Sequence, residues 1–224
     1  MTPRSTPTER ADSLTRSVLE LITDRRVGKD GWLREAEIAA ALGISRTPVR
    51  DALREMAGAG VVIIEPHKGA RIRSYSPGEI EEIYRSRALV EPYVVAAAIP
   101  RLGHKDVQTL KEFSQRMRHM SHDAHRRNEL ATLNREFHSY LLLAAGDHPL
   151  ASTAINMLIP LLLNRVMHTY DEVQSARSMD QHDELIAAAQ LGDPDWAAAI
   201  MRSHILGGLN QFKREIAEQN ASTP

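Results

Sequence analysis

The stretch ISRTPVRDALREM, residues 44–56, decides how the N-terminal part of this chain folds. Ser45 is a favourable N-cap residue, and Pro48 fits the first turn of a helix, where a backbone N–H has no helical partner to lose. The apolar residues that follow recur at intervals of three and four and form one stripe: Val49, Ala52, Leu53 and Met56. This spacing predicts a helix that begins after Ser45 and buries the stripe.

A second stripe on the same predicted helix is cationic. Arg46, Arg50 and Arg54 recur at every fourth position, on a face rotated away from the apolar one. A DNA recognition helix places its N-terminal residues against base edges, and a planar guanidinium can bind guanine O6 and N7 together. The stripe therefore indicates DNA binding through Arg46 and Arg50. The alternative is a solvated basic face, which many surface helices carry.

The residues before this helix predict a helix-turn-helix. A first helix is expected from about Glu9, with an apolar stripe that ends before Gly28. A second, short helix is expected over residues 33–41, and Gly43 turns the chain before Ser45. Two short helices joined by a tight turn are the arrangement that DNA-binding helix-turn-helix proteins use.

The residues after this helix predict a β-hairpin. Residues 61–65 are a β-branched run of strand length, and the alternation over 70–73 is typical of a return strand. A hairpin that follows a recognition helix is the wing of a winged helix-turn-helix. His67 and Lys68 are therefore expected at DNA phosphates or in a minor groove, and Gly69 lets the backbone approach closely. The alternative for His67 and Lys68 is a solvated turn.

Composition limits the class of protein. The chain has 224 residues, of which 4% are aromatic and none is cysteine. The length fits one or two domains, and the absence of cysteine excludes disulfides and Cys-ligated zinc. The sequence contains neither an 18-residue apolar run nor a leader of secretory type. We therefore expect a soluble, cytoplasmic protein that makes no membrane contact.

The chain is predicted to be mainly α-helical and to divide into two domains. Residues 9–75 are expected to form the winged helix-turn-helix, and residues 76–217 an all-helical effector-binding and dimerisation domain. Residues 1–8 are expected to be disordered, and residues 218–224 to fray. Residues 1–75 hold 13 basic and 10 acidic residues, whereas the rest of the chain holds 15 and 19. This asymmetry fits a nucleic-acid-binding head on a body of another kind.

The second domain is expected to begin at a capping box. Ser76 and Glu79 have the spacing of such a box, and Pro77 takes the first helical position. Pro92 and Pro160 fall inside periodic segments, which they are expected to kink or break. Helices are predicted near residues 78–99, 104–126, 128–146, 149–175, 180–191 and 194–217.

Three histidines on three predicted helices stand out in the second domain. Asn134 and His138 are four residues apart, so they share a helix face. His182 is predicted to begin the next-to-last helix, and His204 lies in the last one. Imidazoles that converge inside a bundle can hold a divalent cation. The alternative is that each histidine is hydrogen-bonded within the core.

The N-terminal motifs resemble a known family. Residues 33–56, LREAEIAAALGISRTPVRDALREM, and residues 60–72, GVVIIEPHKGARI, resemble the DNA-binding domain of GntR-family bacterial transcription regulators. The resemblance implies that Arg46 and Arg50 contact bases, that Ser45 and Thr47 hold phosphates, and that the wing near Gly69 enters the minor groove. Many members carry Arg at the position of Ala36, so the operator sequence is not carried over from relatives.

The second domain is similar to the FadR-type ligand-binding (FCD) domain of the same family. The motifs are EIYRSRALVEP at 82–92, NREFHSYLLLAAGDHP at 134–149, HDELIAAAQLGDPDWA at 182–197 and MRSHI at 201–205. The resemblance implies a metal held by an Asp and three His, and the matching residues here are Asn134, His138, His182 and His204. Asn in place of Asp removes one negative charge and should weaken the binding of the metal. A set of three nitrogens and one oxygen still suits Zn²⁺, Ni²⁺ or Mn²⁺. The rival is a metal-free pocket whose histidines bind an anionic effector directly.

The resemblance also implies a small carboxylate effector. Arg87 is the expected partner of the effector carboxylate, and Arg165 is a weaker candidate of the same kind. The alternative for Arg87 is an ion pair within the bundle.

The expected function is a ligand-responsive transcription regulator, a repressor, that binds double-stranded operator DNA as a homodimer. One alternative is a regulator whose effector is the metal itself. Another is a metal-dependent hydrolase, which would lack a clear general base and an H-E-x-x-H pattern.

Overall fold

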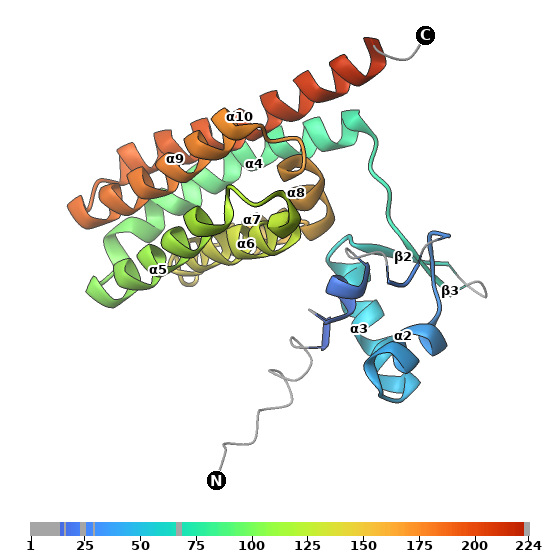
Figure 1. Cartoon of the computed structure of the whole chain (residues 1–224). Helices are drawn as coiled ribbons and strands as arrows, with labels where there is room; N and C mark the ends of the chain where they lie inside the picture. The colour runs from blue at the N-terminus through green and yellow to red at the C-terminus, as the bar shows by residue number, and fades with distance from the viewer. Residues whose placement is uncertain (1–13, 16, 23–25, 29, 66–68, 222–224) are drawn as a thin grey trace. The chain divides into compact units, whose positions relative to one another are not determined.

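The structure is a computed structural model that describes residues 14–15, 17–22, 26–28, 30–65 and 69–221 (Figure 1). The chain divides into two compact units, an N-terminal unit up to Ser74 and a helical unit from Tyr75. The mainly α-helical fold with a small sheet confirms the predicted fold class. In the part of the chain that the structure describes, none of the helices combines the length and apolar character needed to cross a membrane.

The N-terminal unit combines short helices with a three-stranded antiparallel sheet. The described residues between 14 and 22 are helical, and helix α2, Glu35–Leu42, and helix α3, Arg46–Gly58, follow. Gly43 joins α2 to α3 with φ of 66°, a left-handed conformation that favours glycine. The sheet has the order β1-β3-β2, with strands β1 (Trp32–Leu33), β2 (Val62–Glu65) and β3 (Gly69–Ile72).

Strand β1 corrects the predicted start of the second helix. Leu33 is buried in the sheet, where it pairs with Ala70, and α2 begins only at Glu35. The apolar spacing after Leu33 is compatible with a helix. The partner strand lies far along the chain, so the local pattern carries no sign of the pairing.

Helix α3 buries the predicted stripe of Val49, Ala52, Leu53 and Met56. Ser45 stands at the N-cap with an extended backbone, but its hydroxyl makes no capping hydrogen bond with any described residue. An N-cap oxygen accepts from the second or third helical N–H, and the third position here is Pro48, which has none. The predicted cap is therefore correct in position and wrong in its hydrogen bond.

The helical unit is built from helices α4 to α10 around one apolar core. Helix α10 packs along α4 and α9, and α5 packs on α6 and α9 (Figure 1). The predicted capping box opens α4, because the Ser76 Oγ accepts from the Glu79 N–H and the Glu79 carboxylate accepts from the Ser76 N–H. The helices are α4 (Pro77–Ala98), α5 (His104–Met120), α6 (Arg127–Leu143), α7 (Ala151–Asn156), α8 (Pro160–Met167), α9 (Glu172–Leu191) and α10 (Pro194–Ala221).

Several predicted helix boundaries in this unit are wrong. The segment expected to be helical over residues 149–175 holds α7, α8 and the first residues of α9, and it is broken at Pro160, which starts α8 at a position that needs no N–H donor. Helix α9 begins at Glu172 rather than near residue 180, since the Asp171 carboxylate caps it by accepting from the Gln174 N–H. Pro92 lies inside α4 without ending it.

The ends of two further helices differ from the prediction. Helix α5 stops at Met120, and residues 124–126 form a separate 3₁₀ turn. Helix α10 continues to Ala221, beyond the expected end at residue 217. Boundaries of this kind depend on tertiary packing, which a periodic sequence pattern does not contain.

Candidate functional sites

Helix α3 presents its cationic residues to solvent. Arg46, Thr47, Arg50 and Arg54 are exposed, whereas Val49 on the opposite face is fully buried. Beside them lies a groove of about 690 Å³, lined by residues of α2, α3 and the wing that include Arg46, Arg50, Arg54, Ile64 and Gly69. Helix α3 and the β-hairpin therefore line one groove, and α3 places three arginines along it.

Arg50 is held by a carboxylate on the preceding helix. Its Nε and Nη2 donate to Oε1 and Oε2 of Glu35, over 2.7 and 2.8 Å. These hydrogen bonds hold the pKa of the Glu35 carboxyl below its usual value. Both side chains remain partly exposed, so the pair is a weak one that a stronger anion can displace.

The other predicted DNA contacts lie on the same unit. Ser45 and Thr47 are exposed at the start of α3, and the Ser45 hydroxyl is not used as a cap among the described residues. Gly69 is exposed at the start of β3 with φ of 105°, and a Cβ there would meet no described atom within 4 Å. His67 and Lys68 lie outside the described residues.

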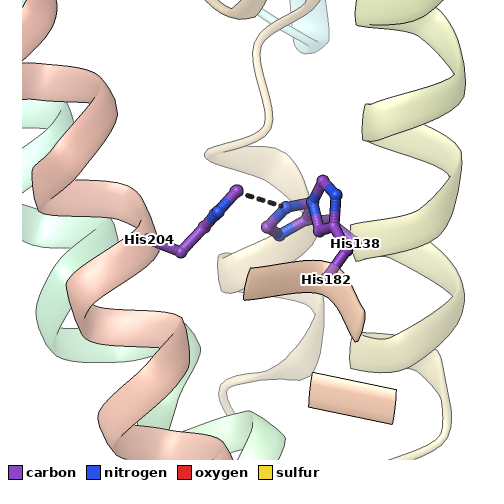
Figure 2. A group of neighbouring side chains, drawn as sticks. All are labelled: His138, His182 and His204. Carbon is purple, nitrogen blue, oxygen red and sulfur yellow. Dashed lines mark hydrogen bonds between the residues drawn. The ribbon is translucent and has the colours of Figure 1, made fainter. Parts of the chain in front are cut away.

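His138, His182 and His204 come together inside the helical unit. Figure 2 shows their side chains pointing toward one another from α6, α9 and α10. One nitrogen of each ring can be chosen so that all three lie within 4.8 Å of one another. His138 Nε2 and His204 Nε2 are 3.2 Å apart. His182 lies midway along α9 rather than at its start, because α9 begins earlier than predicted.

Burial favours the neutral form of His182 and His204. It lowers the pKa of His182 and His204 well below the ordinary value, and the neighbouring imidazoles lower the pKa further. Neutral imidazoles carry the lone pairs that a metal ion requires. The phenyl ring of Phe137, fully buried, packs against His182 with ring centroids 4.6 Å apart. The cluster is therefore buried among closely packed side chains.

The donor atoms of this cluster fit a divalent cation. Several buried polar atoms lack a hydrogen-bond partner among the described residues: both ring nitrogens of His182, Nδ1 of His204 and Oδ1 of Asn134. An unpartnered polar atom in a core is costly, and coordination would satisfy it. Asn134 is buried on α6, one helical turn before His138. Three imidazole nitrogens and a carbonyl oxygen suit Zn²⁺, Ni²⁺ or Mn²⁺.

Arg87 does not stand free in this unit. Its Nε donates to Oε1 of Glu91 over 2.5 Å, and its guanidinium lies over the ring of Tyr84, 4.6 Å from the centroid. Burial alone would raise the pKa of Glu91, but Arg87 and His138 outweigh it and hold that pKa below its usual value. Both members of the Arg87–Glu91 pair are buried.

Glu91 is the residue that the sequence reasoning missed. Its Oε2 lies 3.4 Å from His138 Nδ1, so it contacts the histidine cluster from α4. The available signal was its position one helical turn after Arg87 in a largely apolar segment, where a carboxylate needs a buried partner.

Arg165 lies elsewhere on the helical unit. Its side chain is exposed and belongs to α8, and its Nη1 donates to the Tyr75 carbonyl oxygen over 2.6 Å. Its guanidinium lies 5.5 Å from the ring centroid of Phe212 on α10. Arg165 thus holds the first residue of the helical unit and is not in contact with the three histidines among the described interactions.

A recognition helix with a wing, joined to a helical unit that holds a buried polar cluster, defines a two-domain transcription regulator. Residues 10–72 match the family described as "Bacterial regulatory proteins, gntR family", and residues 82–207 match the FCD domain. The chain belongs to the GntR family, in the branch with an FCD domain. This confirms the resemblance found in the sequence.

Relatives support the same class. A "Probable D-xylose utilization operon transcriptional repressor" from Paenarthrobacter nicotinovorans is 26% identical over 202 residues, which cover 90% of this chain and 88% of that protein. The "HTH-type transcriptional repressor GlaR" of Escherichia coli (strain K12) is 27% identical over 184 residues, with 79% and 84% covered. The solved structure of E. coli McbR/YncC shares the fold with a TM-score of 0.68, at 18% identity over 81% of this chain and 86% of that one.

The family decides between the predicted classes of function. Its members are transcription regulators that bind operator DNA, so this chain is a DNA-binding transcription regulator. The metal-dependent hydrolase is excluded on the same ground.

Proposed function

We propose that this regulator is a repressor that senses a small carboxylate through a divalent metal in its helical unit. The observation that carries the proposal is the cluster of His138, His182 and His204, three buried imidazoles that can each offer a nitrogen within 4.8 Å of the other two. Aliphatic residues would stabilise the core better than three buried imidazoles, so the cluster is not explained by the stability of the fold. It is therefore assigned to the effector side of the regulator.

On the DNA side, Arg46 and Arg50 are proposed to contact bases, and Ser45 and Thr47 to hold phosphates. The wing, with His67, Lys68 and Gly69, is proposed to enter the minor groove. Two observations support this assignment: Arg46 is exposed, and the neighbouring Ser45 hydroxyl makes no capping hydrogen bond with the described residues.

The Arg46→Ala variant tests this interface. We expect it to weaken binding to an operator duplex selected from random sequences by about 1–3 kcal/mol and to relax base preference, because a bidentate base contact is lost. The control is Arg85→Ala, which removes the same charge from an exposed side chain of the helical unit. Unchanged affinity and base preference in Arg46→Ala would show that α3 is not the recognition helix.

On the effector side, the three histidines would hold the metal through ring nitrogens, with the Asn134 carbonyl oxygen as a fourth donor. When bound, the cation would supply a positive charge for an effector carboxylate to complete its shell. Asn134 contributes no negative charge, so the metal should be held less tightly than with Asp, and Asn134→Asp should tighten it.

The metal is tested on untagged full-length protein purified without chelator. We expect elemental analysis to find a divalent metal, and His182→Ala to remove it, whereas His119→Ala, an exposed histidine, should keep it. Operator binding is then titrated with Zn²⁺ alone and with acetate, lactate or succinate added. A response that needs both metal and carboxylate supports the proposal. A full response to Zn²⁺ alone would instead identify the metal as the effector.

The regulator is proposed to act as a homodimer, because operators read by such domains are near-palindromes that match a two-fold axis. Leu89 and Tyr93, one turn apart on α4, are 66% and 63% exposed and place two large apolar side chains next to each other at the surface. Sedimentation of the full chain tests this. A monomer at the concentrations that bind operator would contradict the dimer.

A further inference from the structure

We infer that Glu91 is a positioning residue for His138: its carboxylate accepts a hydrogen bond from the Nδ1–H of that ring and so turns the Nε2 lone pair toward His182 and His204. Arg87 holds Glu91 in place for this task. The inference rests on the proposed metal site, and it adds a residue on α4 to the three histidine-bearing helices.

The geometry divides the two oxygens of Glu91 between two partners. Oε1 accepts from Arg87 Nε over 2.5 Å, and Oε2 lies 3.4 Å from His138 Nδ1. Glu91 and His138 are both 0% exposed. Neither Oε2 nor Nδ1 has an aligned hydrogen-bond partner in the described part of the structure. A hydrogen bond from Nδ1–H to Oε2 would therefore satisfy both buried atoms.

This contact selects the tautomer of His138. A neutral imidazole has one N–H and one lone pair, and a carboxylate that faces Nδ1 favours the proton on that atom. The opposite tautomer would set a lone pair against the Glu91 carboxylate. With the proton on Nδ1, the lone pair lies on Nε2, the atom 3.2 Å from His204 Nε2. In the metal-free protein, His204 Nε2 then carries a proton and donates it to the lone pair on His138 Nε2.

Histidines that bind metals commonly donate their second N–H to a carboxylate, which fixes the ring and raises its basicity. Glu91 has the position and the charge for this role toward His138. A carboxylate buried without compensation would be expensive, and Arg87 provides the compensating charge from the previous turn of the same helix. Arg87 is therefore assigned to the support of Glu91, which accepts from its Nε.

The first test needs no substitution at Glu91. Full-length protein is labelled with ¹⁵N-histidine and treated with chelator, and His138 is assigned by comparison with His138→Gln. We expect ¹⁵N shifts and couplings that show a neutral ring protonated at Nδ1. A ring protonated at Nε2 would overturn the inference.

The second test measures Zn²⁺ affinity by competition with a chelator. Glu91→Gln keeps the size of the side chain and removes its charge. We expect this variant to lower the affinity for Zn²⁺ roughly 10–100-fold. The control is Glu81→Gln, on the same helix, where the carboxylate pairs with Arg85 and Lys213 at the surface. Glu81→Gln should leave Zn²⁺ affinity unchanged. Equal affinity in Glu91→Gln and the parent protein would overturn the inference.

Glu91→Gln leaves Arg87 without its counter-charge, so a second variant guards against misfolding. The double variant with Arg87→Leu and Glu91→Leu removes both buried charges together. We expect it to fold, to lose Zn²⁺ affinity to the same extent and to show mixed His138 tautomers. Wild-type Zn²⁺ affinity in the double variant would contradict the inference. If the parent protein bound no Zn²⁺ at all, the proposed metal function would fail, and the tautomer of His138 would still decide the role of Glu91.

Discussion

At the scale of single residues, the Glu35–Arg50 pair bears on the proposed contact between Arg50 and DNA. Two parallel hydrogen bonds hold the Arg50 guanidinium against α2. The proposed contact with a guanine edge needs the same two guanidinium N–H groups, so Glu35 would compete with DNA for Arg50. Exposed ion pairs contribute little, and the exchange therefore costs little.

Replacing Glu35 should make DNA binding tighter. In Glu35→Gln the charged competitor is gone, and we expect affinity for a selected operator duplex to rise roughly two- to fivefold, the range of a weak exposed ion pair. Fluorescence anisotropy at fixed salt measures the change. The control is Glu37→Gln on the same helix, which removes the same charge. The Glu37 carboxylate lies 4.0 Å from the Arg34 guanidinium, a longer and weaker contact. An equal gain in both variants would show a general charge effect and no release of Arg50.

Sequence reasoning finds residues such as these only in part. The helical spacing of Arg46 and Arg50 fixes their face, because a helix has one period. The partner of Arg50 lies 15 residues away, and Glu91 and His138 lie on different helices. Such contacts depend on how helices pack, so the sequence could propose three histidines together but not the carboxylate behind one of them.

At the scale of elements, two serines that occupy the same N-cap position have different roles. The Ser76 hydroxyl accepts from the Glu79 N–H over 3.2 Å and stabilises the start of α4. The Ser45 hydroxyl makes no such bond among the described residues, since Pro48 stands where the donor would be. The Ser76 hydroxyl therefore stabilises a helix, whereas the Ser45 hydroxyl can hydrogen-bond to a ligand.

The two serines should respond differently to alanine. We expect Ser76→Ala to lower the free energy of unfolding of the helical unit by about 1 kcal/mol, because a capping bond is lost. Ser45→Ala should leave stability nearly unchanged and weaken DNA binding. Urea unfolding and operator titration measure the two effects. A large loss of stability in Ser45→Ala would mean that its hydroxyl caps α3 after all.

Element boundaries show where local rules end. The stripe of α3 and the capping box of α4 come from neighbouring residues, and both were predicted correctly. Strand β1 was missed, and Pro160, which was expected to kink or break its segment, breaks it. The first needs a partner strand from residues 69–72, and the second turns on whether a proline kinks a helix or begins one.

At the scale of the whole molecule, the chain around Ser74 and Tyr75 joins the two units and offers one route for a signal from the helical unit. Arg165 holds the Tyr75 carbonyl from α8 and lies over Phe212 on α10. Helix α10 also carries His204, two turns before Phe212. A change in the histidine cluster that moves α10 therefore has a short physical route to the residue where the helical unit begins.

Breaking this contact should separate sensing from response. In Arg165→Met the aliphatic stem remains and the bond to Tyr75 is lost. We expect Zn²⁺ affinity to stay within about twofold, because Arg165 does not contact the histidines, while the ratio of operator affinities with and without Zn²⁺ and carboxylate moves toward one. That ratio measures the coupling between the two sites directly. Arg85→Met, an exposed arginine paired with Glu81 on α4, is the matched control and should keep the parent ratio. If Arg165→Met also kept it, the response would have to reach the N-terminal unit without the Tyr75 contact, through the dimer contact or another part of the linker.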